Sequence, residues 1–155
     1  MTTALRSLDA FDPQALELLA ASDEFHAALY PAISNHLVDP ATLMQAEVSF
    51  LGLWDGERLL ACGAVRRERD PDGTRYGELK RMFVRPEARG QGLSRQIVAA
   101  LEALLRAEGI ALVRLETGIY QPEAIGLYKG LGFAERGPFG DYQIDPLSLF
   151  MERTL

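Results

Sequence analysis

The sequence predicts a single α/β domain, residues 1–155, built on a mixed sheet that is mostly antiparallel, contains one parallel β-α-β pair and is flanked by helices. Two strong turn signals, at residues 55–56 and 70–73, join three strand-like segments as in an antiparallel meander. A long amphipathic segment then separates two strand-like segments, which is typical of a parallel crossover. The 155 residues are 48% hydrophobic and 25% charged, the ordinary balance of a globular domain with a sizeable core.

The first third of the chain is predicted to be mainly helical. A short strand over residues 3–8 comes first. Residues 12–13, Asp-Pro, form a helix start, because aspartate caps free N–H groups and proline fits the first helical position. Ser22 is a candidate cap for a second short helix, which Pro31 would end. The same Asp-Pro pair at residues 39–40 predicts a further helical turn.

The middle of the chain carries the meander and the crossover helix. A strand is predicted over residues 48–54, which are rich in apolar and aromatic residues, and the two turns join it to strands over residues 59–67 and 75–84. A helix follows over residues 94–108, and Gly109 is its expected left-handed stop. The apolar residues that recur at helical spacing are Ile97, Val98, Leu101, Leu104 and Leu105.

The last third completes the sheet. A strand over residues 111–117 should pair in parallel with the strand ending at residue 84, because a helix lies between them. A short helix is predicted over residues 122–130, and two strands over residues 133–136 and 147–153 form a terminal hairpin. The connecting loop, residues 137–146, is rich in turn residues and is a candidate cover for an acceptor site.

Composition and charge exclude several classes of function. The net charge of −6 argues against nucleic acid as a partner. No uninterrupted apolar run is long enough to span a bilayer, and residues 1–9 lack the basic and apolar blocks of a signal peptide. Cys62 is the only cysteine, which excludes an internal disulfide and fits a reducing compartment. We therefore expect a cytoplasmic protein that binds neither nucleic acid nor membrane.

The segment between the third strand and the long helix is a candidate anion site. Gly90 and Gly92 lie where strand gives way to helix, so backbone N–H groups can face an anion with the helix dipole behind them. A local group of basic residues on an acidic chain also indicates a specific anionic ligand. These residues are Lys80, Arg81, Arg85, Arg89 and Arg95.

Two nucleotide-binding motifs fit this segment less well. A P-loop needs a lysine directly after its last glycine, and no lysine follows Gly92. The dinucleotide fingerprint needs a third glycine, where this chain has Arg95. The glycines therefore favour a different phosphate-bearing ligand.

The run R-G-Q-G-L-S, residues 89–94, resembles the Q/R-x-x-G-x-G/A signature of the GNAT superfamily of acetyl-CoA-dependent N-acetyltransferases. Ser94 departs mildly from the final Gly or Ala, because serine is also small. Residues 124–133, A-I-G-L-Y-K-G-L-G-F, resemble the superfamily's second motif. Tyr128 stands at its frequent tyrosine position, and Gln121 stands where an asparagine is often found. The order of elements also matches over nearly the whole chain, so the resemblance implies a GNAT-like fold.

The resemblance implies acetyl-CoA as co-substrate. No cluster of His, Cys and Asp residues has the spacing of metal ligands, so we expect no metal. The loop 89–94 would bind the pyrophosphate through its backbone. The strand end 82–84 would pair with the pantetheine arm like an extra strand, and an N–H near Met82 or Phe83 would polarise the thioester carbonyl. The cofactor-binding residues that this comparison predicts are Met82, Phe83, Val84, Arg89, Gly90, Gln91, Gly92, Leu93, Ser94 and Gln121.

Acetyl transfer to an amine also requires an acid and a base. Tyr128 is the candidate general acid for the departing thiolate, because a phenol with a pKa of about 10 carries a proton at neutral pH; the alternative is a packed core tyrosine. Glu78, four residues before Met82, matches the basic glutamate of histone-type members and is the candidate general base. Glu116 is an alternative base or an anchor for the acceptor's ammonium, and ordered water is a third alternative.

The acceptor-binding residues are predicted to be Arg81, Glu116 and His36. Lys80 or Arg81 could meet an acidic group of the acceptor or organise the two glutamates; alternatively, these long side chains extend to the sheet edge. His36 falls in the early helix–loop region that commonly lines the acceptor pocket in this superfamily. The predicted function is acetyl transfer to a primary amine of a small-molecule or amino-acid-like acceptor, by direct attack in a ternary complex. The alternative is a non-catalytic acyl-CoA-binding or sensory module, and a homodimer is a candidate assembly.

Overall fold

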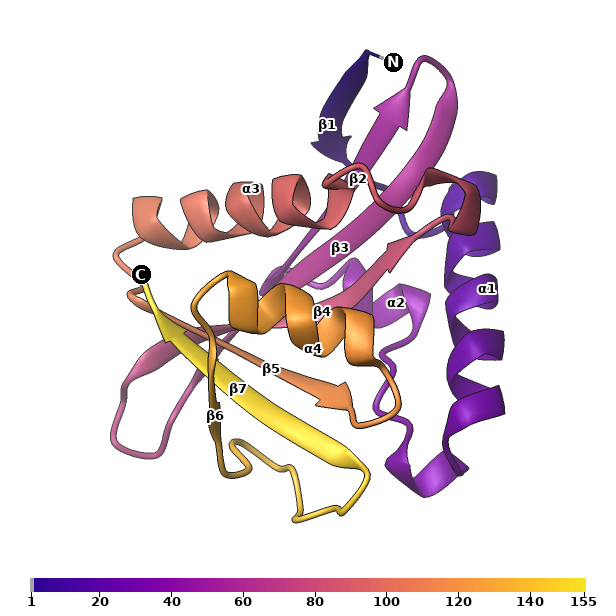
Figure 1. The fold of residues 1–155 in the computed structure, drawn as a ribbon. Helices are drawn as coiled ribbons and strands as arrows, with labels where there is room; N and C mark the ends of the chain where they lie inside the picture. Colours follow the sequence, from indigo (N-terminus) through magenta and orange to yellow (C-terminus); the bar gives the residue numbers. More distant parts are fainter. Residues whose placement is uncertain (1) are drawn as a thin grey trace.

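The computed structural model describes residues 2–155, which form a seven-stranded sheet with helices on both faces (Figure 1). The strands are β1 (Thr3–Ser7), β2 (Val48–Asp55), β3 (Arg58–Arg69), β4 (Arg75–Val84), β5 (Leu112–Gly118), β6 (Ala134–Arg136) and β7 (Ser148–Thr154). The helices are α1 (Pro13–Leu29), α2 (Pro40–Leu43), α3 (Leu93–Ala107) and α4 (Pro122–Gly130), and short 3-10 turns are η1 (Ala32–Ser34) and η2 (Pro86–Ala88).

The strand order is β1-β2-β3-β4-β5-β7-β6, and all neighbours are antiparallel except β4 and β5. The predicted meander, the parallel crossover through α3 and the terminal hairpin are therefore confirmed. β7 pairs with β5 on one side and with β6 on the other, so the last strand lies inside the sheet. This insertion brings the β6–β7 loop beside the parallel pair.

The parallel pair is joined at the start of its strands. Gly77 pairs with Val113, and Glu78 pairs with Arg114. Beyond these pairs β4 and β5 diverge toward their carboxyl ends, as the strand arrows show (Figure 1). Because parallel strands point the same way, both carboxyl ends reach the same side of the sheet. The divergence therefore creates room for a site between them.

A β-bulge lies in β4 beside this opening. The ladder with β3 shifts register so that Arg81 and Met82 lie opposite the single residue Gly63. Arg81 has a φ of 55°, in the left-handed region that residues other than glycine rarely adopt. A Cβ on Gly63 would lie 2.3 Å from the Met82 Sδ, so glycine is needed opposite the bulge.

The helices cover the sheet on opposite faces (Figure 1). One hydrophobic core lies under α3 and α4, and the other lies under α1 and α2. The buried stripe of α3 consists of Leu93, Ile97, Val98, Leu101 and Leu105. Among the helices of residues 2–155, none combines the length and the apolar character that a bilayer crossing requires.

Helix α1 is continuous, so the prediction of a second short helix capped by Ser22 is wrong. No proline or glycine stands between Pro13 and Pro31, and the segment is rich in alanine and leucine, which favour helix. Ser22 is buried within the helix, and its Oγ lies 3.5 Å from Nδ1 of His26, one turn later. Packing of the apolar face of α1 on the sheet therefore keeps Ser22 inside one helix, although serine can also begin a new helix as a cap.

Helix α3 buries one carboxylate, Glu102, which is 3% exposed. Arg153 approaches its Oε1 at 3.3 Å, while Oε2 has no hydrogen-bond partner among residues 2–155. Burial raises the pKa of Glu102 above its ordinary value of 4.5, and the positive charges of Arg153 and Arg106 offset this in part. The folded state therefore binds this proton more tightly than the unfolded state, so this contribution to stability falls as the pH rises above 4.5.

Replacing Glu102 with methionine should raise the free energy of unfolding by about 1 kcal/mol at neutral pH, because a poorly paired buried charge is removed at similar volume. The gain should shrink toward pH 4.5, where the native carboxyl takes up its proton. Urea unfolding at neutral pH and at pH 4.5 measures the change in the free energy of unfolding. Glu24→Met, which removes an exposed carboxylate of α1, is the control and should change stability by less than about 0.5 kcal/mol. A Glu102→Met protein that is less stable at neutral pH contradicts the prediction.

Candidate functional site

The first cavity, called the loop cavity here, has a volume of about 610 Å³ and lies between the end of β4, the loop before α3, and α4. Most of the predicted cofactor-binding residues line it: Met82, Phe83, Val84, Arg89, Gly90, Gly92, Leu93, Ser94 and Gln121. Gln91 belongs to the same loop but is exposed and does not line the cavity. The structure thus gathers residues from three separate segments around one space.

The loop before α3 presents backbone N–H groups. Gly90 and Gly92 have φ values of 78° and 75°, which glycine adopts without strain. Gly92 directly precedes α3, and no side chain of residues 2–155 caps this end of the helix. The first N–H groups of α3 therefore lack partners within the helix and, with the helix dipole, can bind an anion.

Arg89 is held at the rim of the loop cavity by contacts of its own. Its Nε donates a hydrogen bond of 3.2 Å to the carbonyl oxygen of Val84. Its guanidinium lies 5.5 Å from the ring centroid of Phe83 and 6.0 Å from that of Phe25. The terminal nitrogens remain available to a ligand, because only Nε is used in the bond to the strand.

The second cavity, called the inner cavity, has a volume of about 100 Å³ and lies in the opening between β4 and β5. Every predicted catalytic and acceptor-binding residue lines it: Glu78, Tyr128, Arg81, Glu116 and His36. Tyr128 lines the loop cavity as well. The two cavities therefore meet at this side chain.

Tyr128 is fixed in place by α4. Its side chain is buried, and its ring contacts Phe133 edge-on with 5.6 Å between centroids. Burial raises the pKa of Tyr128 above the ordinary value of 10. The phenol therefore carries its proton throughout the neutral range, which a general acid requires.

Glu78 is bound by two partners at one carboxylate oxygen. The Tyr142 hydroxyl donates a hydrogen bond to Oε2 at 2.5 Å, and Lys80 Nζ lies 2.9 Å from the same oxygen. Lys80 also donates to the Tyr142 hydroxyl at 2.6 Å. Burial and the nearby Glu78 charge raise the pKa of Tyr142, so the phenol keeps its proton. Lys80 thus contacts Glu78 both directly and through the Tyr142 hydroxyl.

Glu116 faces the inner cavity from β5. Its side chain is half-buried, and burial raises the pKa of its carboxyl above 4.5, while the Lys80 charge offsets part of the shift. Glu116 makes no ion pair among the residues that the structure describes, whereas Glu78 is paired with Lys80. An ammonium that entered the cavity would therefore find an unpaired carboxylate at Glu116.

Arg81 lines the inner cavity, but its guanidinium is engaged by α1. Its Nη1 donates a hydrogen bond of 2.6 Å to Oδ1 of Asp23. Its Nε is buried and has no hydrogen-bond partner among residues 2–155. The ion pair with Asp23 reduces the net positive charge that Arg81 offers to a ligand.

His36 and Gln121 are also tied to aromatic side chains. His36 lies edge-on to Tyr142 with 5.1 Å between ring centroids, and burial lowers its pKa. Gln121 accepts hydrogen bonds at Oε1 from the Tyr30 hydroxyl at 3.1 Å and from the Gly118 N–H at 3.3 Å. The Gln121 side chain thus binds the last residue of β5, Gly118, through its Oε1 atom. Gln121 also lines both the loop cavity and the inner cavity.

The comparison with known proteins fits this arrangement. Residues 13–133 match the sequence model of the "Acetyltransferase (GNAT) family". The chain belongs to the GNAT family of acetyltransferases. The fold and the enzymatic class implied by the sequence motifs are thereby confirmed.

Individual relatives agree with the GNAT assignment. The chain is 46% identical over 140 residues to the IAA acetyltransferase of Azospirillum brasilense, with 90% of each chain covered. It is 34% identical to the uncharacterised N-acetyltransferase YsnE of Bacillus subtilis, over 81% of this chain and 82% of YsnE. A solved Klebsiella pneumoniae protein assigned as an acyl-CoA N-acyltransferase superposes with a TM-score of 0.79 at 34% identity, covering 99% and 98% of the two chains.

A second solved structure supports the GNAT fold at lower identity. The PaiA N-acetyltransferase of Thermoplasma acidophilum, solved in complex with coenzyme A, superposes with a TM-score of 0.76 at 16% identity, and both chains are fully covered. At this identity the likeness concerns the fold. The same sheet can therefore be built from very different sequences.

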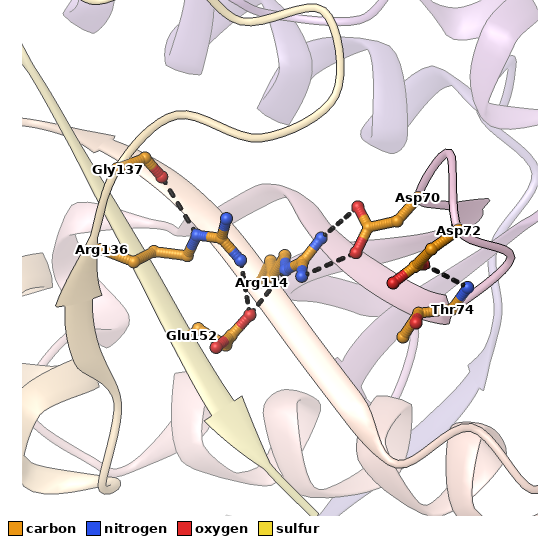
Figure 2. Close-up of polar contacts among 7 residues, drawn as sticks. All are labelled: Asp70, Asp72, Thr74, Arg114, Arg136, Gly137 and Glu152. Carbon is orange, nitrogen blue, oxygen red and sulfur yellow. Dashed lines mark hydrogen bonds and ion pairs between the residues drawn. The ribbon is translucent and has the colours of Figure 1, made fainter.

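A buried arginine links the strands around the parallel pair (Figure 2). Arg114 donates hydrogen bonds of 2.7 and 2.9 Å to Asp70 and one of 2.7 Å to Glu152. Glu152 also accepts a bond of 2.6 Å from Arg136. The network joins the β3–β4 turn to β5, β6 and β7 at the level where Arg114 pairs with Glu78. The network therefore holds β4 and β5 together at the end where they are still paired, beside the opening between them.

The sequence assigns no contact to two aromatic residues of this region. Tyr142 lies in the loop 137–146, which is only a candidate cover for an acceptor site, and Tyr30 lies in the same early helix–loop region as His36. In the structure Tyr142 bonds to Glu78, and the Tyr30 hydroxyl accepts a hydrogen bond from the Tyr120 N–H at 3.1 Å. An aromatic residue in a glycine-rich loop was the available signal, but its partner lies 64 residues away.

Proposed function

We propose that this chain transfers an acetyl group from acetyl-CoA to a primary amine of a small-molecule or amino-acid-like acceptor, by direct attack in a ternary complex. The observation that carries the proposal is the position of Tyr128 on the shared wall of the loop cavity and the inner cavity. A thioester reaching through the loop cavity would end beside an amine held in the inner cavity. Direct transfer needs this proximity and no covalent enzyme intermediate.

Acetyl-CoA is proposed to occupy the loop cavity. The N–H groups around Gly90, Gly92 and the start of α3 would bind the pyrophosphate, and Arg89 would add positive charge. The backbone of residues 82–84, freed from β5 by the divergence of the strands, would pair with the pantetheine arm. A backbone N–H near Met82 would then polarise the thioester carbonyl.

Tyr128 and Glu78 are proposed as the acid and the base. Glu78 would take a proton from the acceptor's ammonium, and Glu116 would hold that ammonium. Tyr128 would protonate the departing thiolate and regain a proton from the nitrogen that has been acetylated, which ends as an amide. The raised pKa of Tyr128 keeps the phenol protonated before this step. The relative named for IAA acetylation supports a small-molecule acceptor.

The decisive experiment is a thiol-release assay. Purified protein with acetyl-CoA should release CoA in proportion to an added amine, across a panel of alkylamines, arylalkylamines and amino acids. Mass spectrometry should show one acetyl group on the nitrogen of the active acceptor. CoA binding without acceptor-dependent release across the panel would contradict the proposal and favour a binding module.

Arg89→Ala should weaken CoA binding by about tenfold, because a charge-assisted contact to phosphate is removed. Titration calorimetry with CoA measures the change. Arg6→Ala, on the exposed edge strand β1, removes the same charge away from both cavities and should leave the affinity unchanged. Equal affinities of native protein and Arg89→Ala would remove Arg89 from the proposed phosphate site.

A further inference from the structure

A third cavity, called the outer cavity, lies on the other side of Glu78 and has a volume of about 850 Å³. It shares Glu78, Lys80 and Tyr142 with the inner cavity. Glu78 itself is 2% exposed. Any proton that Glu78 accepts therefore needs a route through neighbouring side chains before it reaches water.

Glu68 lies beside Glu78 on the wall of the outer cavity. In the β3–β4 ladder Arg66 lies opposite Glu78, and Glu68 lies opposite Tyr76. Glu68 and Glu78 are therefore diagonal neighbours on one face of the sheet, within reach of each other's side chains. Both line the outer cavity. The Glu68 side chain is 23% exposed and that of Glu78 is 3% exposed, so Glu68 is the member that meets solvent.

The charges around the pair favour one shared proton. Burial raises the pKa of Glu68, and the neighbouring Glu78 carboxylate raises it further. Two carboxylates this close are poorly stable when both are ionised. The other charged or titratable groups around them are Arg66 and Arg69 from β3, Tyr76 and Lys80 from β4, Arg114 and Glu116 from β5, His36 from the α1–α2 segment, and Asp141, Tyr142 and Asp145 from the β6–β7 loop.

Tyr142 is not an exit for the proton. Its hydroxyl donates to Glu78 and accepts from Lys80, and its raised pKa keeps the phenolic proton in place. Lys80 is likewise a donor to both groups. Asp141 and Asp145 also line the outer cavity, and Asp145 accepts hydrogen bonds from the Ser34 hydroxyl and the Leu147 N–H. Glu68 is the carboxylate of this cavity that neighbours Glu78 across the β3–β4 ladder, so it can accept a proton from Glu78 and release it to water.

We propose that Glu68 carries the acceptor's proton from Glu78 to the water of the outer cavity. The inference rests on the proposed function, in which Glu78 is the base. The acceptor's ammonium loses a proton to the Glu78 carboxylate and becomes the free amine. Glu78 then passes this proton to the Glu68 carboxylate and is ionised again. Glu68 finally gives the proton to water, so both carboxylates are restored and one hydronium ion leaves per turnover.

The test compares Glu68→Gln with native protein in weakly buffered solution at neutral pH, using CoA release with an active amine. Glutamine keeps the size of the side chain but cannot take up the proton. The kcat should fall by about tenfold, and added imidazole, a small proton acceptor, should restore it. The native enzyme should not respond to imidazole.

Two further variants separate this relay from a structural role. Glu68→Asp keeps a carboxylate and should retain most of the native rate without imidazole. Glu47→Gln removes another carboxylate near Arg66, at 4.0 Å, that lines neither the inner nor the outer cavity, and its rate should equal that of native protein. Thermal unfolding checks that all variants are folded.

The outcomes are distinct. A Glu68→Gln enzyme that is as fast as native protein in weak buffer overturns the relay. A slow Glu68→Gln enzyme that imidazole does not rescue, together with an equally slow Glu68→Asp enzyme, also overturns it. If native protein releases no CoA with any amine, the proposed function is overturned and the relay, which depends on it, is overturned too.

Discussion

Replacing Tyr128 with phenylalanine should lower kcat by about a hundredfold, because general acid catalysis of this kind contributes about 10²–10⁴-fold. The CoA dissociation constant should stay within about twofold, since phenylalanine preserves the ring that packs on Phe133 and lines the loop cavity. Steady-state kinetics of CoA release and titration calorimetry measure the two quantities. Together they separate proton donation from cofactor binding.

Tyr120→Phe is the matched control for Tyr128→Phe. Tyr120 is 52% exposed and lines neither the loop cavity nor the inner cavity, so loss of its hydroxyl should leave kcat unchanged. In the native enzyme, kcat should show no loss from Tyr128 ionisation below about pH 10, because burial raises its pKa above the ordinary value. A Tyr128→Phe enzyme with native kcat would leave Tyr128 as a packing residue.

Gly118→Ala should destabilise the protein by about 2 kcal/mol and disrupt the acceptor side. A Cβ at this position would lie 1.8 Å from the Tyr30 hydroxyl oxygen, a distance that forces the ring to move. The displaced ring would lose its hydrogen bonds to Gln121 and to the Tyr120 N–H, as well as its stacking on Tyr120 at 5.7 Å. Urea unfolding should show the loss, and the KM for the amine should rise more than the KM for acetyl-CoA.

Gly126→Ala is the control for Gly118→Ala and should stabilise the protein instead of destabilising it. Gly126 lies in α4, and a Cβ there meets nothing within 4 Å. Alanine should therefore stabilise the helix by about 0.5–1 kcal/mol and leave the kinetics unchanged. If Gly118→Ala were as stable as native protein, with an unchanged KM for the amine, Tyr30 would have no part in the acceptor wall.

Most of the fold was predictable because its signals are local. The turns after β2 and β3 are given by Asp-Gly and Asp-Pro-Asp-Gly, and the parallel pair by the helix between two strands. The error at Ser22 arose because a serine can cap a helix or lie buried within one, and only packing against the sheet decides. The insertion of β7 between β5 and β6 concerns strands distant in sequence, which no local pattern reports.

The candidate site was predictable in part for the same reason. Gly90 and Gly92 precede α3 in one continuous segment, so an anion site could be inferred from spacing alone. The engagement of Arg81 by Asp23 depends on how α1 lies on the sheet, with the two residues 58 positions apart in the chain. The contact of Tyr142 with Glu78 depends on the pairing of β7 with β5, which brings the β6–β7 loop beside β4.

The sequence by itself determined the class of protein and the segment that can hold a phosphate-bearing cofactor. Turn residues, helix periodicity and glycine positions act over a few residues, and they are visible without coordinates. The tertiary structure decided which charged groups meet: it placed Lys80 and Tyr142 on Glu78 and left Glu116 unpaired among the described residues. It also brought Tyr128 to the wall between two cavities. These relations depend on the divergence of β4 from β5 and the insertion of β7, because long-range packing sets both.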